Sequence, residues 1–260
     1  MYVMNGGVGT VTIVAAAQLT HRTTSRETTE MHARTAVPIE DLLSNLPLFK
    51  GLDEKELKAI GLEVGQMNLP RGAALFRPGD PCSGIHLVVS GHVKISLGTA
   101  DGAEKVVDLA GPGQTLGETA VFLDRPHKTS AETLSDSRLL HIAKEQVFAA
   151  VRNHPGFAQR IIAGLSDRLD RFISDLESLT LHSGTERVVS YLLSCLEGTS
   201  ERSHAAVTLP ASKGIIASRL NLTQEHFSRI LHDLAATNLI RVDGRYIMIP
   251  DVAQLRACAP

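Results

Sequence analysis

The chain has 260 residues, 43% of them hydrophobic and 21% charged, a composition typical of a globular protein with room for one or two domains. Its formal net charge of -2 excludes a uniformly basic protein that coats nucleic acid regardless of sequence, but it permits a local DNA-binding face. The three cysteines stand far apart and form no pair with metal-ligand spacing, which favours a reduced, cytoplasmic setting.

Residues 1–38 are predicted to be a disordered extension. The apolar stretch from Val8 to Leu19 lacks the positive start of a secretory signal, and it is shorter than the about 20 apolar residues that a membrane-spanning helix needs. The Ser/Thr/Arg-rich run that follows, up to Ala36, has no hydrophobic periodicity. We therefore expect no membrane association, and folded structure from about Ile39 onwards.

Residues 39–153 are predicted to form a first domain rich in short strands. Two helices open it, over 39–46 and 54–62, and Asp53 is the expected cap of the second. Glycine and proline turns then separate β-rich segments at 66–69, 74–76, 85–90, 92–97, 104–109 and 131–142. A short helix over 144–151 follows. Many short strands with glycine corners indicate a small antiparallel barrel or roll.

Residues 154–181 are predicted to form one long helix, about 40 Å in length at roughly 1.5 Å per residue. Its apolar residues recur at alternating intervals of three and four, the repeat of a helix that packs along a twin. They are Ile162, Leu165, Leu169, Phe172, Leu176 and Leu179. Burying them contributes roughly 9 to 18 kcal/mol per chain, against an association cost of roughly 4 to 15 kcal/mol. A core helix inside one domain is the alternative, but the strict repeat favours a homodimer.

Residues 182–255 are predicted to form a winged helix-turn-helix. Ser183 and Glu186 have capping-box spacing and open a first helix, which a polar loop over 199–206 follows. Ser212 is expected to cap a helix ending at Leu220, and Thr223 to cap a second one ending near Ala236. Strands over 239–242 and 246–249 would then flank a type I′ turn at Asp243-Gly244.

The second of these two helices presents candidate base-reading side chains in its first turns: Gln224, Glu225, Ser228 and Arg229. The last three share one face, where a carboxylate can accept from cytosine N4 and a guanidinium can donate to guanine O6 and N7. The alternative is a solvent-facing salt bridge between Glu225 and Arg229. Double-stranded DNA is thus the expected partner. Further contacts are expected from Ser212, Lys213, Arg219, Arg241 and Arg245.

Two stretches, LPRGAALFRPGDPCSGIHLVVSGHVKI and GQTLGETAVFLDRPHKTSAETL, resemble the cyclic-nucleotide-binding roll of the Crp/Fnr family of bacterial transcription regulators. The resemblance covers about residues 46 to 250. It implies an α+β fold with an N-terminal antiparallel β-roll, a long dimerisation helix and a C-terminal winged helix-turn-helix. It also implies that Gly117 and Glu118 belong to a phosphate-binding cassette, the glutamate binding a ribose hydroxyl. The alternative is a retained corner of the roll.

The cassette departs from the cyclic-AMP type. The family's Arg-Ser pair is replaced by a stretch, 126–131, that is longer by one residue and offers Lys128 and Thr129. Lysine is a hydrated point charge without arginine's two-pronged geometry, so cyclic AMP is the less favoured effector. No cysteine precedes Cys82, which excludes the iron–sulfur cluster of the family's oxygen sensors.

The FLDRP and TSAETL segments are similar to the nitric-oxide-responsive Dnr/NnrR branch, and this resemblance implies haem as the cofactor. The candidate ligand is His154, just before the long helix, and His86, His92 and His141 offer further imidazoles. The E-x-x-S-R pattern of residues 225–229 is similar to the Fnr and Dnr type and implies a palindrome of TTGAT half-sites. The family also implies activation through RNA polymerase.

Two rival functions remain. One is a cyclic-nucleotide-responsive regulator, and the other is a cyclic-nucleotide-binding regulatory module that does not bind DNA. An enzyme is not expected, because the sequence holds no nucleophile–base pair, metal cluster or phosphate loop.

Overall fold

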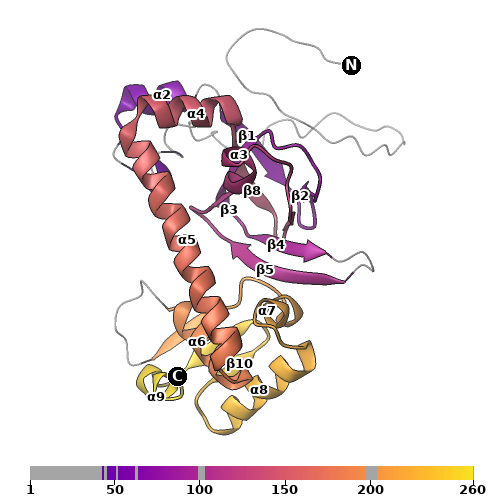
Figure 1. Ribbon diagram of the computed structural model, residues 1–260. Coiled ribbons are helices and arrows are strands. Elements are labelled where there is room, and N and C mark those ends of the chain that lie inside the picture. The colour runs from indigo at the N-terminus through magenta and orange to yellow at the C-terminus, as the bar shows by residue number, and fades with distance from the viewer. Residues whose placement is uncertain are drawn as a thin grey trace, which may run out of the picture.

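The computed structural model describes residues 43, 46–50, 52–61, 64–98, 103–196 and 204–259, so the predicted extension and most of the predicted helix over 39–46 lie outside it. A β-roll and a small C-terminal domain lie on the same side of a long helix that runs past both (Figure 1). Within the described residues, no helix is both long and apolar enough to cross a membrane.

The roll consists of two four-stranded antiparallel sheets. One has the order β1 (Val64–Leu69), β8 (Ser137–Ala143), β3 (Gly84–Ser90), β6 (Thr115–Leu116), and the other β2 (Ala74–Phe76), β7 (Ser130–Thr133), β4 (Val93–Gly98), β5 (Glu104–Ala110). The predicted antiparallel roll is confirmed. The segment predicted as a single strand over 131–142 is two strands, since the chain crosses between the sheets there. The short β6, which pairs with His86 and Leu87, was not predicted.

Apolar side chains from both sheets fill the roll, among them Val88, Val93 and Leu139, which are fully buried. A second cluster closes the end of the roll where the 3-10 helix η1 (Pro47–Phe49), α2 (Glu54–Gly61) and α4 (Lys144–Asn153) meet the start of the long helix. Asp53 caps α2 as expected, because its Oδ1 accepts from the Glu56 N–H at 2.8 Å. A short helix that was not predicted, α3 (Glu118–Phe122), follows β6.

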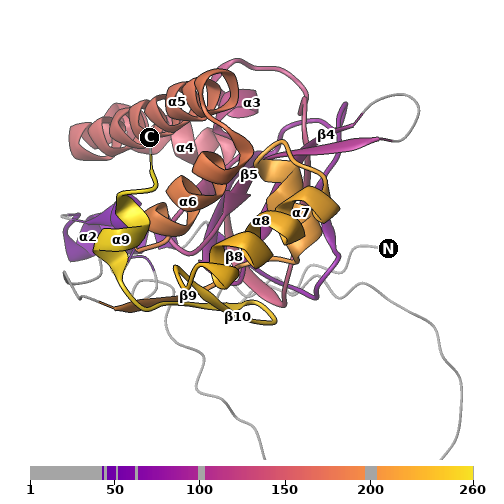
Figure 2. The same cartoon turned by 90° about the horizontal axis from the view of Figure 1, so that it is seen from below.

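The long helix α5 spans Pro155–Leu181 and so begins one residue later than the predicted range of 154–181, because His154 is its N-cap. After the confirmed Ser183–Glu186 capping box come α6 (Gly184–Ser194), β9 (Ala205–Thr208), α7 (Lys213–Arg219), α8 (Gln224–Ala236), β10 (Arg241–Asp243), β11 (Tyr246–Ile249) and α9 (Val252–Arg256). Figure 2 shows α6, α8 and α7 in a group beside α5.

The wing differs from the prediction in three ways. It has a third strand, since β9 pairs with β11 where the polar loop was expected to continue to residue 206. The loop between β10 and β11 consists of Gly244 and Arg245, and only its first residue, Gly244, has a positive φ (58°). This is the pattern of a type II′ turn, so the type I′ prediction is wrong. The terminal helix α9 was also not predicted.

Gly91 turns the chain between β3 and β4 with φ 88°, and a Cβ there would lie 2.1 Å from Ser137 Oγ and 2.8 Å from Asp136 O. Gly79 has a similar φ of 90° but open space around it.

We expect Gly79→Ala to lower the free energy of unfolding by about 1–2 kcal/mol, the penalty of a left-handed backbone. Gly91→Ala should cost clearly more, because it adds a collision with β8. Urea unfolding of the two variants measures the difference, and equal losses would contradict the close packing of this corner.

Candidate DNA-reading face and effector cavity

The helix-turn-helix is built from local signals that the sequence carries. Asn221 makes the turn with φ 55°, a left-handed conformation that asparagine tolerates better than most residues. Thr223 caps α8, its Oγ1 accepting from the His226 N–H at 3.2 Å. Ser212 is the N-cap residue of α7, but its hydroxyl makes no cap hydrogen bond in the described structure, so that part of the prediction is wrong. The spacing of apolar residues also predicts a core for the motif, and five of its seven residues are buried: Ile216, Phe227, Ile230, Leu231 and Leu234. The other two, Leu220 and Leu222, are half-buried and pack against this core.

The predicted DNA-contacting residues of α8 and of the start of α7 lie where the N-terminal ends of these two helices meet. Gln224 Oε1 lies 2.6 Å from where a Cβ on Gly214 would be, so these two ends are in contact. Of the others, Arg219 ends α7, whereas Arg241 and Arg245 lie in the wing. Ser212, Gln224, Glu225 and Arg229 are exposed, whereas Lys213 and Ser228 are half-buried. Among the ion pairs of the described residues there is none between Glu225 and Arg229. The alternative role for this pair, a surface salt bridge, is therefore absent, and both side chains are available to a ligand.

Arg219 has a different role from the phosphate contact that was expected of it. Its Nη2 lies 2.5 Å from Asp175 Oδ2 of α5, and both side chains are largely covered. A guanidinium held this closely by a carboxylate is not free to follow a DNA backbone. Arg219 therefore connects the helix-turn-helix to the long helix.

The predicted dimer seam is left uncovered along α5. Ile162, Leu169 and Leu176 are 61–63% exposed, while Leu165, Phe172 and Leu179 are 37–42% exposed. Ile173, which the three–four repeat did not include, is also exposed and lies next to the more exposed set. We call these seven residues the seam. A contiguous apolar face of this length marks an interaction site.

A second row of residues on α5, Ile161, Arg168 and Asp175, faces this chain's own domains; we call it the inner stripe. Ile161 is buried in the cluster at the end of the roll. Arg168 Nη2 lies 3.0 Å from Asp108 Oδ2 of β5, and its Nη1 lies 3.6 Å from Glu118 Oε2 of α3. Asp175 pairs with Arg219, as described above. Since the three residues follow one another at intervals of seven, they share one side of the helix.

A cavity of about 400 Å³ lies between α5 and the roll, and Arg168 and Glu118 are among the residues that line it. Of the four predicted effector residues, Glu118 alone lines this cavity. Gly117 precedes it with φ 94°, in a corner where a Cβ would lie 3.0 Å from Gly84 O. Lys128 and Thr129 do not line it, and Lys128 is exposed. Lys128 therefore does not supply a phosphate-binding charge within this cavity.

Haem does not fit the cavity. Among the described residues that line it, none carries an imidazole, a thiol or a thioether. His154, the predicted ligand, lies outside it, and its Nδ1 is engaged by Glu56 Oε1 at 2.8 Å. The described residues also contain no group of three or more His, Cys, Asp or Glu side chains that could hold a metal ion. The described residues that line this cavity therefore offer no axial ligand for a haem iron.

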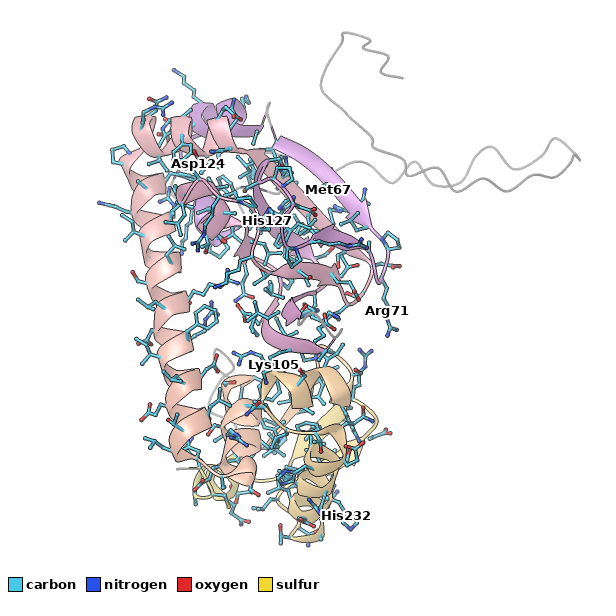
Figure 3. The ribbon with its side chains drawn as sticks, turned by 45° about the vertical axis from the view of Figure 1, so that its right-hand side comes forward. Met67, Arg71, Lys105, Asp124, His127 and His232 are labelled. Atoms are coloured by element: carbon cyan, nitrogen blue, oxygen red, sulfur yellow. The ribbon has the colours of Figure 1, made fainter. Side chains whose placement is uncertain are left out.

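Three histidines that sequence reasoning did not connect meet inside the roll. His86 of β3 pairs across the sheet with His141 of β8, their ring centroids 4.8 Å apart. His127 stacks on Phe76 at 3.8 Å, and Figure 3 shows it within the roll. His86 is 6% exposed, and its Nδ1 has no hydrogen-bond partner among the described residues. Burial, and then the neighbouring His141 and His127, lower the pKa of His86 to about 3.

This histidine should make the roll acid-sensitive. The pKa of His86 is about 3 in the folded protein and 6.5 ordinarily, so between these values the unfolded chain binds the extra proton. The free energy of unfolding should therefore fall as pH decreases from 6.5, by up to about 1.4 kcal/mol per pH unit. His86→Leu should reduce that slope, and His232→Leu, at an exposed position of α8, should not. Urea unfolding of the wild-type protein and of both variants at several pH values measures these slopes. A His86→Leu variant with the same slope as the wild-type protein would refute the assignment of the acid sensitivity to His86.

Comparison with known proteins agrees with this geometry. The family model of the cyclic nucleotide-binding domain matches residues 66–154, and that of the Crp-like helix-turn-helix domain matches residues 186–258. Over 219 residues the chain is 26% identical to a CRP-like cAMP-activated global transcriptional regulator of Mycobacterium tuberculosis, an alignment that covers 84% of this chain and 98% of the relative.

Over 191 residues the chain is 31% identical to the nitrogen fixation regulation protein FixK of Azorhizobium caulinodans, covering 72% of this chain and 75% of the relative. The structure of FixK2 from Bradyrhizobium japonicum matches with a TM-score of 0.68 at 20% identity, covering 76% of this chain and 98% of that one. The structural match supports the fold.

Proposed function

Because this chain belongs to the Crp/Fnr family of transcription regulators, whose members are not enzymes, we propose that it binds a DNA palindrome as a homodimer under the control of a signal received by the roll. The uncovered seam carries the proposal. It lies on the helix that joins the cavity to the helix-turn-helix, so pairing two copies there brings two recognition helices together. The proposed units are 39–153 for sensing, 154–181 for pairing and 182–255 for DNA.

The recognition helix is α8. Glu225, Ser228 and Arg229 are proposed to read bases, because they share one face of the helix. Glu225 and Arg229 are also exposed and form no salt bridge with each other. Gln224, Ser212 and Lys213, at the adjoining helix ends, are proposed to contact DNA beside them. The pattern of residues 225–229 supports half-sites of the TTGAT type. In a two-fold dimer these half-sites would lie about one helical turn apart, or roughly 34 Å.

The signal is proposed to act in the cavity beside Glu118. That carboxylate is buried and faces Arg168, so a ligand that disturbs the pair would act directly on α5. The Mycobacterium tuberculosis relative is described as cAMP-activated, but in this chain the residues expected to hold a cyclic phosphate lie outside the cavity. Nitric oxide sensing through haem lacks a ligand residue there. Activation through RNA polymerase, in the cytoplasm, is proposed from family membership alone.

Arg229→Ala should abolish specific binding to a TTGAT palindrome. Each guanidinium–guanine contact discriminates by about 1–3 kcal/mol, and a dimer loses two of them, so affinity should fall on the order of 100-fold. Fluorescence anisotropy with the palindrome and a scrambled duplex measures this effect. Arg256→Ala, which removes an exposed arginine of α9, is the matched control. Undiminished specific binding by the Arg229 variant would refute the assignment of α8.

Leu169→Asp should give a monomer, because it places a carboxylate in the middle of the apolar seam. Ser174→Asp adds the same charge to an exposed position of α5 outside the seam and should leave the dimer intact. Sedimentation velocity distinguishes the two species. A dimeric Leu169 variant would show that the protomers do not pair through this face.

A further inference from the structure

The roll contacts the helix-turn-helix directly, where β5 meets the end of α7. The Val106 N–H donates to Ser218 Oγ at 3.0 Å, and the Lys105 ammonium donates to the Ser218 carbonyl and, at 3.2 Å, to Asn221 Oδ1. Leu109 of β5 also packs against the core of the C-terminal domain. Figure 3 shows Lys105 at the boundary between the two domains.

The next residue along α7 is held from another direction. Arg219 pairs at 2.5 Å with Asp175 on the inner stripe of α5. Two neighbouring residues, Ser218 and Arg219, are therefore fixed by two different elements: the sensory sheet and the dimerisation helix. The turn of the motif follows at Asn221, and α8 begins at Gln224. A change in either attachment would therefore tilt the start of α8.

The two attachments depend on each other electrostatically. Burial, and then the nearby Arg219 and Arg187, lower the pKa of Lys105, so its ammonium lies among other cations in a partly dry junction. Of these cations, Arg219 is paired with a carboxylate, that of Asp175. Without it, the repulsion between Arg219 and Lys105 would be uncompensated, and such repulsion is stronger at a partly buried site than in open solvent.

We propose that Lys105 and Asp175 are positioning residues for DNA recognition, and that they determine which spacing between half-sites the dimer accepts. The inference rests on the proposed function. Adding one base pair moves the second half-site by about 3.4 Å and rotates it by about a tenth of a turn around the duplex. A DNA-binding domain held by both attachments has a fixed orientation and binds half-sites at one spacing. A domain that has lost one attachment can change its orientation and bind half-sites that are one base pair closer or farther apart.

The test uses palindromes at the preferred spacing and with one base pair added or removed between the half-sites. The measured quantity is the ratio of Kd values at the altered and preferred spacings. Asp175→Asn and Lys105→Met should each lower this ratio by about two- to fivefold, because the first removes a partly exposed ion pair and the second removes the hydrogen bonds of the ammonium to Ser218 and Asn221. Asp170→Asn removes the same charge from an exposed position of α5 and should keep the wild-type ratio.

The swap Asp175→Arg with Arg219→Asp restores the pair in reverse, and it should recover part of the discrimination that Asp175→Asn loses. An unchanged ratio in both single variants would overturn the inference while leaving DNA binding intact. A wild-type protein that binds the palindromes of all three spacings equally would likewise overturn the inference and leave the proposed DNA binding intact. A wild-type protein that binds none of the palindromes would instead refute the proposed function, and this inference with it.

Discussion

An apolar face that its own chain does not cover constrains the whole molecule. Along α5 the seam passes the roll and the C-terminal domain, while Arg168 and Asp175, on another side of the helix, form ion pairs with the roll and the C-terminal domain. Water-exposed apolar area costs about 25 cal/mol per Å², so this face favours a second copy in the same register. Pairing two identical helices imposes two-fold symmetry, and two-fold symmetry places two recognition helices on one duplex. The proposed palindrome therefore follows from packing.

The inner stripe makes the same helix a connector as well as a dimer contact. Arg168 lines the cavity and pairs with Asp108 of the roll, and two turns later Asp175 pairs with Arg219 of the DNA-reading domain. A helix is stiff over this distance, so a shift imposed at Arg168 reaches Asp175 with little loss. Together with the contact from Lys105, two routes link the sensory roll to the start of α8.

The lining of the cavity differs from what the family resemblance implies, because Glu118 is its one described residue from the expected cassette and none of its described residues is a haem ligand. Buried carboxylates require partners, and the buried Glu118 and the half-buried Asp108 both have theirs in Arg168, a residue of this chain. A ligand must therefore compete with an internal guanidinium. Burial lowers the pKa of His86, His127 and His141, which favours an uncharged ring at this position between the sheets. Two of them, His86 and His127, pack against Phe76 of the roll core.

The sequence alone determined features that depend on residues close together in the chain. These include the range of α5, the Ser183–Glu186 and Thr223 caps, and the helix-turn-helix, because periodicity and capping act within about two turns. Only the tertiary structure decided contacts between distant segments. Arg219 meets Asp175 across 44 positions and Arg168 meets the Thr115 carbonyl across 53, and no local pattern encodes either distance. The tertiary structure also decided the exposure of Ile173, the third wing strand and the absence of a haem ligand from the described lining of the cavity. Each of these depends on which surfaces face one another after folding.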